Sequence, residues 1–119
     1  MPVAQPLVGE YRFGRIVVGG RVYERDVLVT PSGVLSPWWR REGHLLALED
    51  LGEAASADVD CVVVGTGYSG MMEVLDEVVE HFRRRGVKVY IADTRRAVEL
   101  YNQLVRSGAR VLGAFHLTC

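Results

Sequence analysis

Three apolar runs alternate with two amphipathic stripes along the second half of the chain, and this order restricts the fold more than any other feature. The apolar runs cover residues 60–64, 87–93 and 109–117, and each is short enough for a buried strand. The stripes between them have the spacing of one face of an α-helix. The order is therefore that of a βαβαβ unit. Right-handed crossovers would make its three strands parallel, with their C-terminal ends on one edge of the sheet.

The two stripes also predict where the helices begin and end. The first helix is expected to start directly after Gly70 and to stop at Gly86, and the second is expected to run from an N-cap at Thr94 to Gly108. The apolar residues of the first stripe are Met71, Val74, Leu75, Val78, Val79 and Phe82. Those of the second are Ala97, Val98, Tyr101, Leu104 and Val105.

The first half of the chain has β character instead. Residues 11–18 and 21–29 are two β-rich runs joined by Gly19-Gly20, which predicts a hairpin. In the first run the apolar side chains change face across Gly14, so a bulge is expected there.

Further turns and a loop follow the hairpin. Residues 31–33, Pro-Ser-Gly, predict a turn into a short strand at 34–35 that Pro37 ends. The segment 36–59 is the least regular part of the chain, with a loop followed by a short helix near 47–55. Together with the βαβαβ unit in 60–119 and the hairpin and short strand in 11–35, it makes residues 1–119 one domain.

Composition excludes several classes of protein. The chain has 119 residues with 14 basic and 15 acidic side chains, so it lacks the basic excess of a general nucleic-acid or membrane-surface binder. No apolar stretch is long enough to span a membrane, and the N-terminus lacks the pattern of a secretory signal. We therefore expect a cytoplasmic protein. The two cysteines, Cys61 and Cys119, form no C-x-x-C pair, and nothing predicts a metal or a cofactor.

The segment between the first strand and the first predicted helix contains a G-x-G-x-x-G pattern. Free backbone N–H groups at such a strand-to-helix turn can bind an anion, and Asp93 at the end of the next strand stands where a ribose-binding acid is expected. However, only one βαβαβ unit is present, and a bulky tyrosine sits inside the pattern. A tight turn chosen for backbone shape, a small-anion or nucleotide site, and a dinucleotide site all remain open. The candidate ligand residues are Gly65, Thr66, Gly67, Tyr68, Ser69 and Gly70 together with His116.

A second candidate is the loop sequence "WWRREGH". Two tryptophans beside two arginines can clamp a planar or anionic group, anchor a protein partner, or cover the core. The candidate partner-binding residues are Trp38, Trp39, Arg40, Arg41 and His44. Asp26 is an isolated acid directly before the apolar "VLV", where it either faces solvent or hydrogen-bonds a nearby loop. An uncovered hairpin edge also leaves a homodimer open.

Five sequence segments resemble a known family: the hairpin "YRFGRIVVGGRVYERDVLV", "WWRREGH", "VVVGTGYSGMM", "TRRAVELYN" and the terminal "HLTC". The resemblance is to a small single-domain family of unknown function that contains a mitochondrial complex I assembly factor and an adipogenesis-associated domain protein. It covers roughly residues 11–119. It implies a three-layer α/β fold with a mixed central sheet and an added β hairpin. It also implies an uncharacterised, non-enzymatic module that works through protein partners, with no assigned cofactor.

Overall fold

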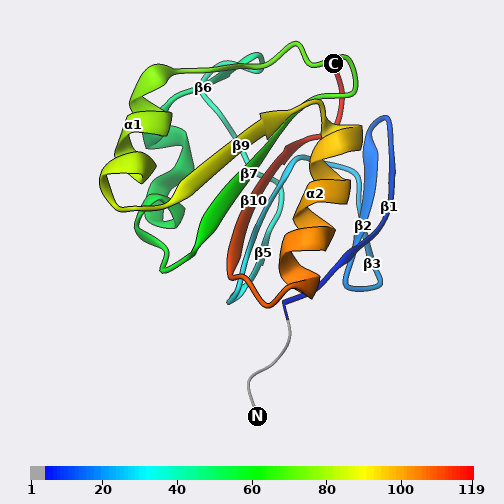
Figure 1. Cartoon of the computed structure of the whole chain (residues 1–119). Helices are drawn as coiled ribbons and strands as arrows, with labels where there is room; N and C mark the ends of the chain where they lie inside the picture. The colour runs from blue at the N-terminus through cyan, green and yellow to red at the C-terminus, as the bar shows by residue number, and fades with distance from the viewer. Residues whose placement is uncertain (1–4) are drawn as a thin grey trace.

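The computed structural model describes residues 5–119, and a five-stranded mixed sheet forms its centre (Figure 1). The strand order is β5 (Gly33–Leu35), β4 (Val27–Thr30), β10 (Val111–His116), β7 (Cys61–Thr66) and β9 (Lys88–Ala92). Strands β10, β7 and β9 are parallel to one another, whereas β4 is antiparallel to β10 and β5 is antiparallel to β4. The three-layer α/β architecture with a mixed sheet is thus confirmed, and so is the parallel arrangement of the three C-terminal strands.

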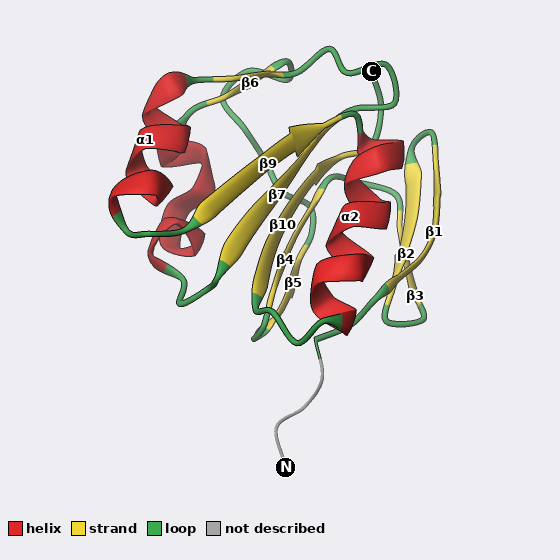
Figure 2. Ribbon diagram, in the orientation of Figure 1, coloured by secondary structure: helices red, strands yellow, loops and turns green. Residues whose placement is uncertain are grey.

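Each face of the sheet has its own apolar core. The 3-10 helix η1 (Leu48–Ser56) and helix α1 (Asp76–Arg84) cover one face, where Val62, Leu112 and Phe82 are fully buried. Helix α2 (Thr94–Arg106) covers the other face together with a small antiparallel sheet, as Figure 2 shows. That small sheet has the order β1 (Val8–Arg12), β2 (Arg15–Val18), β3 (Arg21–Tyr23). No helix within residues 5–119 is long and apolar enough to cross a membrane.

The N-terminal region confirms one hairpin and corrects two strand assignments. Strands β2 and β3 pair around Gly19-Gly20, both of which have positive φ, as expected. Residues 11–18 are not one bulged strand, because the chain reverses at Gly14, whose φ is 76°, and separates β1 from β2. Residues 21–29 are likewise two strands: β3 stays in the small sheet, while β4 crosses into the central sheet, where its residues 27–29 are buried.

The first helix begins five residues later than the apolar stripe predicts. Residues 71–75 are extended, and their strand β8 (Glu73–Val74) pairs with β6 (Leu45–Leu46) in a two-stranded parallel sheet. Met71 fits the helical spacing of the apolar residues but is 59% exposed. Its place in that spacing is therefore a coincidence, and it does not belong to the buried face of α1. Backbone bonds from Glu73 to the His44 carbonyl and from Leu75 to the Leu46 carbonyl hold the extended segment. The N-cap of α2 is also corrected, from Thr94 to Asp93, whose carboxylate accepts the Arg96 N–H.

Candidate functional site

The C-terminal ends of β7 and β10 lie beside the loop that follows β5. Several of the polar residues that the sequence suggested as candidates lie at this edge of the sheet. His116 ends β10 and is the register partner of Thr66 at the end of β7. Because β4 is antiparallel to β10, with Phe115 opposite Val27, the residue before β4 lies beside His116. That residue is Asp26. The sheet register therefore brings together two side chains that are 90 positions apart in the chain.

Asp26, His116 and Arg40 form a buried polar cluster. An Asp26 Oδ2 oxygen lies 2.7 Å from His116 Nδ1 and 2.8 Å from Arg40 Nη1, while Oδ1 accepts the Leu117 N–H at 2.8 Å. The side chains are only 15%, 7% and 4% exposed, respectively. The short contact with a carboxylate requires a proton on Nδ1, so neutral His116 is the Nδ1–H tautomer and Nε2 carries a lone pair. Within residues 5–119, that Nε2 atom and Arg40 Nε have no hydrogen-bond partner.

Arg40 fixes the loop that carries it. Its guanidinium stacks on the Trp38 ring at 4.6 Å, and its Nη2 donates to the Gly43 carbonyl at 2.9 Å. Trp38 Nε1 in turn donates to the Asp50 carbonyl in η1. The loop is thus tied to the sheet by an ion pair and to η1 by an indole N–H. Asp26 was expected either to face solvent or to hydrogen-bond a nearby loop, and the second alternative is correct. Asp26 is the residue that joins the other members of the cluster.

The cluster lowers the pKa of Asp26. Burial opposes ionisation of this carboxyl, but hydrogen bonds from His116, from the Leu117 N–H and from Arg40 outweigh it, so the pKa lies below the ordinary value of 3.8. A carboxyl whose pKa falls on folding stabilises the folded state above its unfolded pKa. That contribution is lost as the pH falls from about 3.8 through the lower, folded pKa.

Acid unfolding provides the corresponding prediction. We expect the contribution of Asp26 to the free energy of unfolding to be constant above about pH 5. Below about pH 4 it should decrease as this carboxyl takes up a proton. The measurement is urea unfolding at pH values from 7 to 2.5, for the wild type and for Asp26→Asn. The asparagine variant should lack this part of the acid dependence. Curves of equal slope below pH 4 would contradict the prediction.

The loop residues 38–41 alternate between inside and outside, and this divides the candidate partner-binding set. Trp38 is 3% exposed and Arg40 is buried in the cluster, so these two side chains are not available to a partner. Trp39 is 72% exposed and Arg41 is also exposed. His44 is exposed as well, with its ring centroid 6.0 Å from that of His116.

Trp39 stands at a large groove. The groove has a volume of about 1070 Å³ and lies between the β5–loop segment and η1. Leu35, Pro37 and Trp39 line one side, and Leu51 and Ala54 line the other. On its charged rim, Arg41 Nη1 lies 2.6 Å from Glu49 Oε1. Much of this lining is therefore apolar.

The glycine-rich segment does not form a strand-to-helix turn, because the chain runs from it into the extended residues 71–75. Gly65 and Thr66 still belong to β7, and the turn covers residues 67–70. Most of its backbone donors are occupied by the chain itself: the N–H groups of Gly67, Tyr68 and Met71 donate to Thr94 Oγ1, to the Thr118 carbonyl and to the Cys119 carbonyl. Residues 118–119 thus occupy the space in front of the turn where the anion alternative would place its ligand.

The remaining residues of this segment have structural contacts. A Cβ on Gly65 would lie 2.8 Å from Thr94 Oγ1, so glycine permits α2 to approach the sheet closely. Thr66 Oγ1 donates to the Ala92 carbonyl. The Tyr68 ring stacks under Arg95, 4.4 Å away, and Ser69 is exposed. Asp93 caps α2 instead of standing free for a ribose. Gly70 has a φ of 71°, which completes the turn.

No group of three or more histidine, cysteine or acidic side chains within residues 5–119 is placed to hold a metal ion. Asp26 is the residue of this site that sequence patterns placed least well. Its only signal was its position as an isolated acid before a buried strand, where a charge needs a partner.

The fold defines the class of protein. A Bordetella pertussis protein described as a Mth938-like domain has a TM-score of 0.76 at 24% identity, over 97% of this chain and 87% of that one. This likeness shows a Mth938-like fold.

The chain belongs to a family of proteins of unknown function, DUF498/DUF598, whose sequence model matches residues 8–116. The conserved hypothetical protein PH1505 from Pyrococcus horikoshii OT3 is 28% identical, with a TM-score of 0.77 over 94% of this chain and 98% of that one. A Bordetella parapertussis protein is also 28% identical, with a TM-score of 0.80 over 98% and 99%.

Proposed function

We propose that this chain is a non-enzymatic binding module that holds an apolar segment of a partner protein in the groove beside Trp39. The observation that carries the proposal is the contrast between neighbours: Trp38 is 3% exposed and Trp39 is 72% exposed. An isolated exposed indole on the wall of an apolar groove is a typical anchor for a protein contact, because tryptophan dominates many binding hot spots.

The polar cluster supports this proposal by fixing the anchor. Arg40 is paired with Asp26, which also accepts the His116 Nδ1–H, and Trp38 donates to η1, so the residue between them is presented in a defined direction. A rigid anchor loses little side-chain entropy on binding. The groove volume of about 1070 Å³ is at the upper end of ligand-sized pockets and accommodates several apolar side chains.

The family resemblance supports the same reading. The segments "VVVGTGYSGMM" and "HLTC" resemble a family that contains a mitochondrial complex I assembly factor, which acts through protein partners. We propose a comparable role in holding or assembling another protein for this chain. The small-molecule alternative at the glycine-rich segment is weaker, because most of the N–H groups that would bind the ligand already donate within the chain.

A peptide library displayed on phage tests the proposal without a known partner. Selection on the wild type should enrich segments with at least two apolar residues. Trp39→Ala should weaken their binding at least roughly tenfold, because truncation of an anchor residue costs more than about 1.4 kcal/mol. Trp39 emission should also shift to shorter wavelength when its ring leaves water.

The matched control is Phe13→Ala. Phe13 is another exposed aromatic, at the turn between β1 and β2, and it does not line the groove. Wild-type affinity in this variant, beside a loss in Trp39→Ala, would support the groove. Failure to enrich any peptide, or peptides that bind Trp39→Ala as well as the wild type, would overturn the proposal.

A further inference from the structure

The opposite edge of the central sheet, strand β9, is open. It is the last strand in the order, and within residues 5–119 no strand pairs with its outer side. The Lys88 N–H donates to the Asp60 carbonyl, at the start of β7, so the Lys88 backbone faces inward. Since backbone direction alternates along a strand, the N–H and C=O groups of Val89 and Ile91 face outward. These are the groups to which a further strand would bond.

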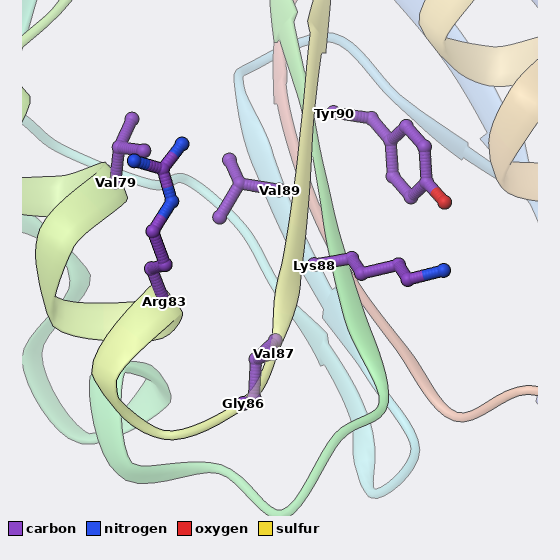
Figure 3. A pocket seen from close by; sticks show the side chains of 7 residues that line it. All are labelled: Val79, Arg83, Gly86, Val87, Lys88, Val89 and Tyr90. Atoms are coloured by element: carbon purple, nitrogen blue, oxygen red, sulfur yellow. The ribbon is translucent and has the colours of Figure 1, made fainter.

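A cleft of about 400 Å³ lies along this edge (Figure 3). The side chains of Val79 and Arg83 extend from α1 on one side of β9, and Val89 points toward them. Lys88 and Tyr90 project from the other side of the strand. An added strand would therefore contact apolar side chains on the α1 side of the sheet. It would have Arg83 on that side and Lys88 on the other.

Charge indicates the kind of strand that fits. Among the described residues that line the cleft, Arg83 and Lys88 are the charged ones, and both are positive. The nearby acid on α1, Glu80, lies 3.4 Å from Arg83 Nη1 in an exposed pair, which offsets that charge only weakly. A second copy of this chain would bring another Arg83 and Lys88 to the same edge, so like charges oppose self-pairing.

We propose that β9 accepts a sixth strand from an acidic, extended segment of a partner protein. Main-chain bonds to Val89 and Ile91 provide the affinity, and carboxylates beside Arg83 and Lys88 provide the selection. This surface is independent of the Trp39 groove, which borders β5 at the other end of the sheet. Each proposal can fail without the other.

Two synthetic peptides test this inference: acetyl-Glu-Glu-Val-Val-Glu-Glu-amide, which places carboxylates on both faces of an extended strand, and its counterpart with lysine in place of glutamate. In amide NMR spectra, the glutamate peptide should shift the Val89 and Ile91 resonances and slow their hydrogen exchange, more strongly at low salt. The lysine peptide should bind at least tenfold more weakly. The double variant Arg83→Glu, Lys88→Glu should reverse this preference.

Ile91→Pro is the backbone test, with Ile91→Ala as its control. Ile91 is 47% exposed and its N–H faces outward, so proline removes the outward donor without breaking a bond to β7. Binding should be lost in Ile91→Pro and kept in Ile91→Ala. If circular dichroism shows that the proline variant does not fold, the charge-reversal result decides.

Three outcomes would overturn the proposal. One is equal binding of the two peptides, and another is a set of shifted resonances away from β9. The third is a concentration-dependent dimer of the wild type that Ile91→Pro abolishes, since that would assign the edge to self-pairing.

Discussion

Replacing Asp26 with asparagine should lower the free energy of unfolding by about 3–5 kcal/mol, the usual loss when one partner of a buried ion pair is removed. The reason is that Arg40 remains. Its side chain is 4% exposed and keeps its charge, and asparagine offers it no carboxylate. The single oxygen of asparagine can also accept from only one of the two sides, so either the His116 Nδ1–H or the Leu117 N–H loses its acceptor. Urea unfolding at pH 7, followed by circular dichroism, measures the loss.

The neighbouring pair Arg41–Glu49 provides a matched control. Its charged atoms lie 2.6 Å apart, but its side chains are 76% and 60% exposed. Water screens an exposed pair, so Glu49→Gln should leave the free energy of unfolding close to that of the wild type. The two variants each remove one carboxylate that pairs with an arginine of the same loop, and they differ in burial. Equal losses would show that the cluster does not carry the stability assigned to it.

Periodicity predicted the parts of the fold that depend on local pattern. The three parallel strands, the hairpin at Gly19-Gly20 and the short helix before β7 follow from residue spacing and turn chemistry. Its errors lie where a long-range contact decides. Met71 fits the spacing of the α1 stripe, yet residues 71–75 pair with the chain near His44 and Leu46, and no local signal indicates that pairing.

In the candidate site, too, local pattern predicted some features and long-range contacts decided the others. The motif "WWRREGH" indicated the loop that carries Arg40 into the polar cluster, but the sequence did not distinguish an exposed Trp39 from a buried Trp38. That distinction depends on Arg40 meeting Asp26 and His116, which β4 and β10 bring together. Of the glycines, Gly67 and Gly70 have positive φ in a turn that leads into an extended segment and not into a helix, and residues 118–119 occupy the space before that turn.

Substituting alanine for Gly67 should destabilise the protein by about 2–6 kcal/mol, for two separable reasons. Its φ of 111° is a conformation that residues with a Cβ rarely adopt, which costs about 1–3 kcal/mol. A Cβ there would also lie 2.3 Å from the Cys119 carbonyl carbon and 2.6 Å from the Thr118 carbonyl oxygen. Residues 118–119 must then move, which breaks the bonds from Tyr68 and Met71 and adds about 1–3 kcal/mol.

Gly86→Ala separates the two costs. Gly86 follows α1 with a φ of 75°, and a Cβ there would meet no atom within 4 Å. This variant should lose only about 1–2 kcal/mol, the cost of the left-handed backbone. Thermal and urea unfolding of both variants measures the difference. In Gly67→Ala, the Tyr68 and Met71 amides should also exchange faster with solvent. If the two variants lose equal stability and those amides stay protected, residues 118–119 do not pack against Gly67 as described.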